Sequence, residues 1–366
     1  MIGIYIFGLS LIINMILVFI RKKSNFIATI HCLFIWILAV FSYDVVDYEN
    51  YANSFKLFKT SDFGTLNSFE PGYYALCKVI SNCGFDFIVA RGIIITTALI
   101  LLIIVARKIG SSPNFAVVLF TIYPLFIELI QIRTLLAMSF LSIGIVYGLA
   151  QKKKKVFFFW MLVASSIHIS FLIYLILLFY DITLSKKERK ILYFCFVLAI
   201  CGGFYVGGRN FPFLKNILML FGDSERFNFW LTSSGNLGFI FYCLLIMLAI
   251  YNSKLVYKNM DENTFYPEVI YKINVMSLCF VPLFMMASTF GRLISNISFV
   301  NYLLWDSSNF ERKAVSYRHF PKYKILLSIG ILLYLGLWFF LEIHGEFNLR
   351  VLLFFKNNTL LQWLER

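Results

Sequence analysis

The chain has 366 residues, of which 60% are hydrophobic and 14% are charged, and its mean hydropathy is +0.80. This composition excludes a soluble globular domain and predicts an all-α polytopic membrane protein surrounded by membrane lipid. In a soluble chain, the formal net charge of +14 would indicate nucleic-acid binding, but here the basic residues stand at the ends of apolar runs. We therefore expect no nucleic-acid partner and interpret the charge as a topology signal.

Apolar runs long enough to cross a bilayer recur along the chain, and we expect one integral membrane domain over residues 1–366. The first run contains no basic n-region and no small-residue cleavage site, so we expect a retained span rather than a signal peptide. The predicted spans are 2–20, 25–43, 86–106, 115–129, 133–149, 156–180, 191–206, 237–251, 268–288, 291–305 and 325–342.

Basic clusters between these runs predict the orientation, because cytoplasmic loops carry an excess of Lys and Arg. Placing every cluster inside predicts a multi-pass protein of the bacterial inner membrane with both termini extracytoplasmic. Two sizeable loops, 44–85 and 207–236, then lie on the extracytoplasmic side. The clusters are 21–23, 107–108, 152–155, 186–190, 254–258 and 312–324.

One pair of basic clusters does not fit a simple alternation. Residues 152–155 and 186–190 are both basic, yet a single apolar run, 156–180, separates them. A re-entrant hairpin that turns at 165–170 returns the chain to the cytoplasm, and it brings the total to about twelve membrane segments. The alternative is one tilted helix with the second cluster outside.

The apolar stretch 115–150 is interrupted by Glu128, Gln131 and Arg133. An ionised side chain at the bilayer centre costs about 2.5–3.5 kcal/mol or more, so these residues need partners, water or a function. The predicted topology places them at an outer turn between two spans. An alternative is that Arg133 snorkels to the interface with Glu128 as a structural ion pair.

The first outer loop is rich in carboxylates and phenols. Asp44, Asp47 and Tyr51 are spaced so that one helical turn would place all three on one face, and Glu70 follows before the next helix. Acidic residues contribute little to membrane orientation, so topology does not explain them. The alternative is a solvated loop with an aromatic belt.

Further polar residues fall on the same predicted side. His168 and Ser170 stand at the tip of the predicted hairpin, Arg226 lies in the second loop, and Arg292 follows a Phe-Gly pair. Arginine suits phosphate oxygens because its donors form a fixed fork, so arginines converging at membrane depth would suit a lipid-linked phosphate or pyrophosphate. A buried, satisfied histidine is the alternative for His168.

These residues form short motifs in a characteristic order, and together they resemble the EpsG family of Wzy-type polysaccharide polymerases. The likeness is close over the first half of the chain and looser over the second. The motifs are Asp47-Tyr48-x-x-Tyr51, Glu70-Pro71-Gly72-Tyr73, Tyr123-Pro124, Gln131-Ile132-Arg133-x-x-x-Ala137, Ile167-His168-x-Ser170, Arg226-Phe227-x-Phe229 and Gly291-Arg292.

The resemblance implies a GT-C-like polymerase that transfers a growing glycan from one polyprenyl pyrophosphate to the end sugar of another lipid-linked repeat unit. Its products would be capsular, exopolysaccharide or O-antigen chains, and a flippase and a chain-length regulator of the same pathway would be partners. We expect Asp47 to act as the base, with Asp44 or Glu70 as alternatives, and Arg133 and Arg292 to hold the pyrophosphate. Expected substrate-binding residues are Asp44, Tyr48, Tyr51, Glu70, Gln131, His168, Ser170 and Arg226.

The sequence has no metal-ligand spacing, no P-loop and no Gly-rich dinucleotide turn, so we expect no cofactor and a metal-independent reaction driven by the activated sugar. The main alternative is a transporter or flippase of lipid-linked oligosaccharide. A carrier needs polar groups reachable from both faces and often has an internal repeat. The sequence shows no such repeat, and its inner-side polar residues are typical of positive-inside anchors. Another glycosyl or acyl transferase and a non-catalytic scaffold are further alternatives.

Overall fold

The computed structural model describes residues 2–60, 70–181, 238–259, 265–286, 288–306 and 320–364. These residues form helices and one isolated bridge, between Ser42 and Asn358, and they contain no strand. The predicted span 191–206 and the second outer loop, 207–236, lie outside the described residues. Five helices in the described ranges are long and apolar enough to cross a membrane. They are Ile2–Phe19, Phe87–Ile109, Ile132–Gln151, Phe239–Asn259 and Tyr323–Glu346.

The first two helices form a hairpin whose turn is fixed by side-chain caps. The Ser24 hydroxyl accepts the N–H of Ile27 at 3.3 Å, which satisfies one free donor at the start of α2. The Ser24 N–H donates to the Asn114 side chain at 2.8 Å, so the turn is held against the start of α6. These elements are α1 (Ile2–Phe19), α2 (Asn25–Phe41) and α6 (Pro113–Ile122).

The first outer loop contains two short helices, α3 (Tyr48–Thr60) and α4 (Pro71–Asn82). Asp44 and Asp47 have φ values of +51° and +64°, so both precede α3 in the left-handed region. Asp44 therefore lies outside the helical turn that contains Tyr51, whereas Asp47 stands at the start of that turn, because its carbonyl accepts the N–H of Tyr51 at 3.1 Å. The next helix, α5 (Phe87–Ile109), is capped by Asp86 and ends at Gly110, whose φ of +80° suits glycine.

The stretch predicted as spans 115–129 and 133–149 is divided more finely than expected. The Tyr123-Pro124 peptide separates α6 from a short helix α7 (Leu125–Ile130), because proline cannot donate a backbone hydrogen bond. After Gln131 the chain enters α8 (Ile132–Ile143), which continues through a π-helical turn. Gly148 allows the next helix, α9 (Lys154–Ile167), to pack closely, since a Cβ at position 148 would lie 2.6 Å from the backbone nitrogen of Phe157.

The run 156–180 is not one continuous helix. Helix α9 (Lys154–Ile167) ends at His168, whose backbone is extended, and the 3-10 helix η4 (Ile169–Phe179) then packs back along α9. Lys154 at the start of one arm lies 2.8 Å from the Asp181 carboxylate at the end of the other. The chain therefore turns at His168 and returns to the end from which it came.

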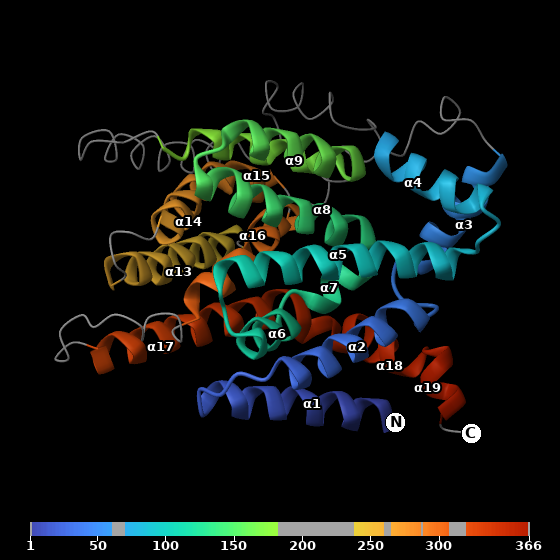
Figure 1. The fold of residues 1–366 in the computed structure, drawn as a ribbon, viewed down its shortest axis with the longest axis horizontal. Helices are drawn as coiled ribbons and strands as arrows, with labels where there is room; N and C mark the ends of the chain where they lie inside the picture. The colour runs from blue at the N-terminus through green and yellow to red at the C-terminus, as the bar shows by residue number, and fades with distance from the viewer. Residues whose placement is uncertain are drawn as a thin grey trace.

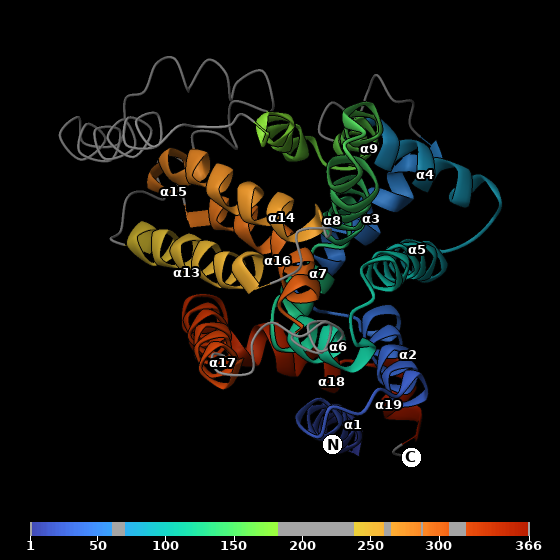
Figure 2. The same ribbon diagram turned by 60° about the vertical axis from the view of Figure 1, so that its left-hand side comes forward.

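The C-terminal helices form a second group beside α8, as Figure 2 shows, with α17 packed against α13. A buried polar network holds this group together: the Asn274 amide donates to Ser253 and to Asn301, each at 2.8 Å. The helices of this group are α13 (Gly238–Asn259), α14 (Phe265–Met276), α15 (Val281–Met286), α16 (Arg292–Trp305) and α17 (Phe320–Trp338). The short helices α18 (Leu353–Lys356) and α19 (Thr359–Leu364) follow and lie against α2 instead.

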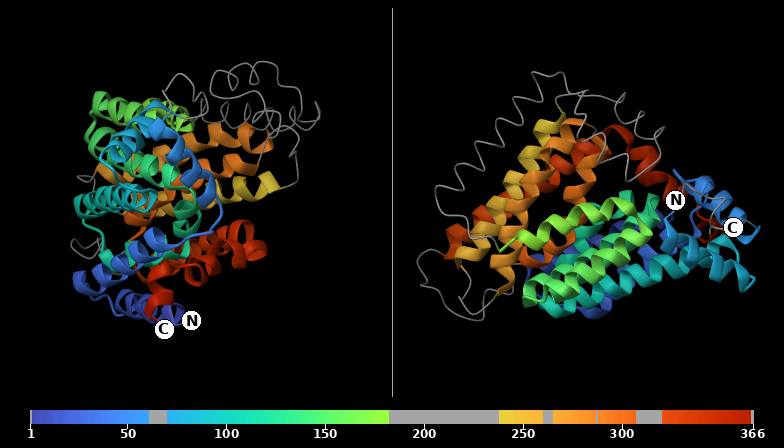
Figure 3. Two further views of the ribbon diagram at one scale, coloured as in Figure 1. Left: turned by 90° about the vertical axis from the view of Figure 1, so that its right-hand side faces the viewer. Right: turned by 90° about the horizontal axis from the view of Figure 1, so that it is seen from above.

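The two ends of the helical bundle differ in character (Figure 1). One end carries the turn after α1, the end of α5 and the turn between α8 and α9, all of which are basic. The opposite end carries α3, α4 and the two chain termini, which lie close together in Figure 3. The bridge between Ser42 and Asn358 brings the C-terminal segment back to the end of α2.

Candidate active site

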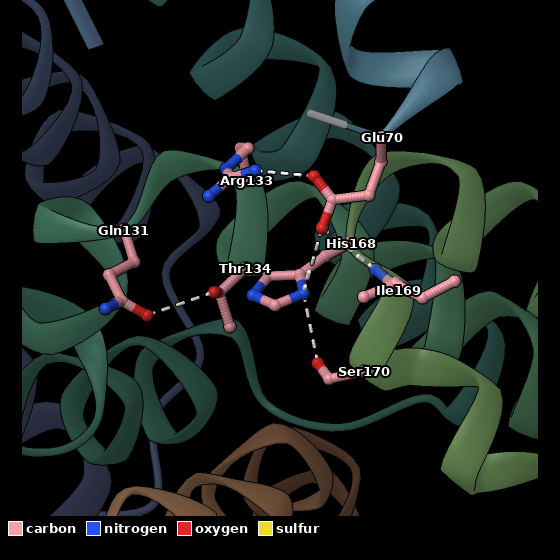
Figure 4. Close-up of polar contacts among 7 residues, drawn as sticks. All are labelled: Glu70, Gln131, Arg133, Thr134, His168, Ile169 and Ser170. Atoms are coloured by element: carbon pink, nitrogen blue, oxygen red, sulfur yellow. Dashed lines mark hydrogen bonds and ion pairs between the residues drawn. The ribbon is translucent and has the colours of Figure 1, made fainter. Parts of the chain in front are cut away.

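The Glu70 side chain joins three segments that are far apart in the sequence. Glu70 is the N-cap residue of α4, but its side chain makes no capping hydrogen bond. Instead its carboxylate accepts from the Arg133 guanidinium at 2.5 Å and from the backbone N–H of Ile169 at 3.2 Å (Figure 4). Both charged side chains are about nine-tenths buried, with exposures of 13% and 14%. Such a charge-assisted contact in a dry setting is among the stronger interactions that a protein makes.

Close packing at a glycine places Glu70 over the hairpin tip. A Cβ at Gly72 would lie 2.3 Å from the Ser166 hydroxyl and 2.8 Å from its carbonyl oxygen. Only a residue without a side chain allows this approach between α4 and α9. The Glu-Pro-Gly motif therefore has a structural reason. Proline begins α4, glycine lets α4 pack against α9, and the glutamate side chain contacts Arg133.

Two tyrosines surround the Arg133 guanidinium. Its central carbon lies 5.6 Å from the ring centre of Tyr51 and 5.4 Å from that of Tyr73, which is cation–π geometry. Burial raises the pKa of the Tyr51 phenol, and Arg133 opposes part of that shift. Burial also raises the pKa of Tyr73. Both phenols are therefore neutral at physiological pH, and the cluster has one guanidinium facing one carboxylate.

His168 lies at the edge of the same cluster. Its Nδ1 is 3.1 Å from the Ser170 hydroxyl and 3.7 Å from the nearer Glu70 oxygen (Figure 4). The side chain is 26% exposed, twice the fraction for Glu70, so it forms the more open side of the cluster. The structure thus brings His168 and Ser170 together with Glu70 and Arg133.

Asp47 borders this cluster through Tyr51. It lies one helical turn before Tyr51 and raises the Tyr51 pKa electrostatically, and its carboxylate accepts from Asn50 at 3.3 Å. Asp47 is half-buried and forms no ion pair with the described residues. Asp44 is exposed and points to Asn357, whose amide lies 3.5 Å from it. Asp47 is therefore nearer to the Arg133 group than Asp44.

Two other expected binding residues have separate surroundings. Gln131 accepts from the Thr134 hydroxyl at 3.2 Å, at the turn before α8. Tyr48 lies beside Arg91, whose guanidinium carbon is 5.3 Å from the ring and whose Nη1 donates to the Ser42 carbonyl at 2.5 Å. Gln131 is two residues from Arg133, whereas Tyr48 shapes the junction between α2, α3 and α5.

Arg292 belongs to a second polar cluster. It interacts electrostatically with Glu128, which is 1% exposed and accepts from Ser295 at 3.4 Å. The partner of Arg133 is Glu70, so the alternative that paired it with Glu128 is wrong. The Tyr174 hydroxyl donates to the Leu293 carbonyl at 2.8 Å, which ties the arm after His168 to the start of α16.

Sequence analysis missed a third group of polar residues, which adjoins Arg292. The Glu342 carboxylate accepts from Tyr242 at 2.9 Å and from Arg350 at 2.7 Å, and Arg350 also donates to Glu346 at 2.5 Å. The regular spacing of 342, 346 and 350 at the end of an apolar run was the available signal. Arg226 and the loop 207–236 lie outside the described residues. Within the residues that the structure describes, no three His, Cys, Asp or Glu side chains form a group suited to a metal ion.

Comparison with known families decides the identity. A scan against models of protein families matches residues 25–352 to the EpsG family. The chain belongs to the EpsG family. This EpsG match covers all three polar groups and confirms the resemblance seen in the motifs. It indicates a general role as a glycosyltransferase-like polysaccharide polymerase. A search of curated proteins and a search of solved structures find no match for this EpsG family member.

Proposed function

We propose that this EpsG family member lengthens capsular, exopolysaccharide or O-antigen chains by glycosyl transfer between polyprenyl-pyrophosphate-linked oligosaccharides. The observation that carries the proposal is the meeting of Glu70, Arg133 and His168, which come from three separate motifs, in one partly buried cluster. A carboxylate, a guanidinium and an imidazole in a dry setting provide the charges that transfer of a pyrophosphate-activated sugar requires.

Arg133 is proposed to hold the leaving pyrophosphate. As the bond between the anomeric carbon and the phosphate oxygen breaks, negative charge grows on that oxygen, and a fixed guanidinium stabilises it. The Tyr51 and Tyr73 rings that Arg133 contacts orient it, and Glu70 holds its guanidinium in place before substrate binds. Glu70 is therefore a positioning residue in this scheme, and Arg292 is a second cation at the start of α16.

Asp47 is proposed to take the proton of the acceptor hydroxyl. The acceptor oxygen forms a bond to the anomeric carbon, its proton moves to the carboxylate, and the pyrophosphate leaves with the bonding electron pair. Asp47 suits this role better than Glu70, because both Glu70 oxygens already accept hydrogen bonds from Arg133 and Ile169. The Asp47 carboxylate has no such ion pair among the described residues.

The reaction is proposed to occur at the outer face of the bacterial cell membrane. The cluster lies at the hairpin tip beside α4, at the end of the bundle opposite the basic turns (Figure 1). Under the positive-inside rule the basic end faces the cytoplasm, so the cluster and both termini face outward. Lipid-linked repeat units would then reach the site from the outer leaflet.

The experiment is polymerisation by the purified chain in vesicles that contain a defined lipid-linked repeat unit. Asp47→Asn should stop chain growth and leave single repeat units on the carrier, whereas Glu49→Gln, which changes an exposed carboxylate two residues further along, should make full-length product. Long chains from Asp47→Asn would overturn the assignment of the base. If the protein were a flippase, the wild type itself would move repeat units across the vesicle membrane and would not lengthen them.

A further inference from the structure

An apolar groove lies between α2 and α5 at the basic end of the bundle, with α6 as its third wall. Helix α2 packs against both α5 and α6 (Figure 2), and Phe299 of α16 also lines the groove. The groove encloses about 210 Å³. Its lining is apolar over most of its length, through residues such as Ala28, Ile35, Leu102 and Phe120.

The length of the groove matches one leaflet of a bilayer. Along α2 it runs from Asn25 to Ile35, which is about 15 Å at 1.5 Å per residue. Along α5 the lining runs from Leu99 to Arg107, which is about 12 Å at the same rise per residue. Half of a hydrocarbon core about 30 Å thick is also about 15 Å. A hydrocarbon chain that entered at the basic end would therefore reach the middle of the membrane.

Polar and charged residues gather at one end of the groove. Asn25, Arg107 and Ser111 line that end, whereas Cys32 and Leu99 line the deep end. Three more basic residues, 21–23, immediately precede α2, and the Ser24–Asn114 hydrogen bond holds this turn beside the mouth. The mouth is thus cationic, and it complements an anionic headgroup rather than a zwitterionic one.

We infer that this groove binds one chain of an anionic glycerophospholipid from the leaflet at the basic end, with the headgroup phosphate against Arg107. The inference does not rest on the proposed polymerase activity, because the groove lies at the end of the bundle remote from Glu70. The tail of a polyprenyl-linked substrate is a less suitable occupant. Its phosphate would lie near Arg133, at the opposite end, whereas the polar mouth of the groove is at Arg107.

The test is native mass spectrometry of the purified full-length chain with phosphatidylglycerol or phosphatidylethanolamine. Phosphatidylglycerol should bind more tightly, and Arg107→Gln should weaken it about fivefold. Lys108→Gln removes the same charge from the next residue, which packs over Tyr147 rather than lining the groove, and should have little effect. Ala106→Phe keeps Arg107 but fills the groove, and it should also weaken binding.

Three results would overturn the inference. Equal affinity for the two phospholipids would remove the headgroup argument. Equal losses in Arg107→Gln and Lys108→Gln would indicate diffuse attraction rather than a site. Displacement of phosphatidylglycerol by a polyprenyl phosphate, with the loss again confined to Arg107→Gln and Ala106→Phe, would assign the groove to the isoprenoid chain. Thermal unfolding of each variant shows whether it is folded, and phosphatidylglycerol should raise the unfolding midpoint of Lys108→Gln by more than that of Arg107→Gln.

Discussion

The contact between Glu70 and Arg133 makes a quantitative prediction about how the first outer loop is held. Glu70→Gln and Arg133→Gln each remove one charge from a pair whose side chains are 13% and 14% exposed. A hydrogen bond to a charged group contributes about 1.5–3 kcal/mol, and we expect a coupling energy in that range because the pair is largely shielded from water. The single variants should therefore each be destabilised, and the double variant should lose much less than the sum of the two.

The assay is the free energy of unfolding of the four proteins in the same mixed micelles. The Lys154–Asp181 pair at the other end of the hairpin is a matched control, because its side chains are 46% and 47% exposed. An exposed pair contributes about 0.2–1 kcal/mol, so Lys154→Gln and Asp181→Asn should be close to additive. A Glu70–Arg133 coupling no larger than that of this control would refute the argument from burial.

Three further predictions test close packing, capping and orientation. Gly148→Val should lower the midpoint of thermal unfolding, because a Cβ there would lie 2.6 Å from the Phe157 backbone. Gly336→Val places the same β-branched side chain in a helix where the glycine has open space, so it is the control. Equal losses in the two variants would count against tight packing of α8 on α9. Asp306→Ala should reduce the free energy of unfolding by about 1–3 kcal/mol, because it removes the carboxylate that accepts the Ser112 N–H at the start of α6 at 2.5 Å. An unchanged value would show that this contact is not stabilising. Ser166→Cys, with the native cysteines removed, should react with an impermeant maleimide from outside the cell, and reaction only from the cytoplasm would reverse the proposed orientation.

The sequence predicted the features that depend on neighbouring residues, namely the helical class and the bounds of the first spans. Hydropathy predicted the helical membrane class, and the described residues contain five helices that could span. The first two predicted spans, 2–20 and 25–43, agree with α1 and α2 to within two residues at each end. The apolar run 115–129 was predicted as one element, although Pro124 inside it was a visible break signal, and α6 and α7 are the result.

Pairing between distant residues could not be derived from the sequence. Glu128 stands five positions before Arg133 and was the natural partner by spacing, yet Glu70 reaches Arg133 because Gly72 lets α4 dock on the hairpin. The same limit hid the contact between Tyr242 and Glu342, which lie on separate helices. Short motifs identified residues that meet, but only the fold shows which carboxylate faces which cation.

The central claim is that the Arg133 cluster performs glycosyl transfer, and one measurement tests it most directly. Wild-type protein and Arg133→Ala are placed in vesicles with equal amounts of a lipid-linked repeat unit, and the products are separated by length. The account predicts a ladder of long chains for the wild type and only single repeat units for the variant, at equal amounts of folded protein. A ladder of the same length and rate from Arg133→Ala would contradict it.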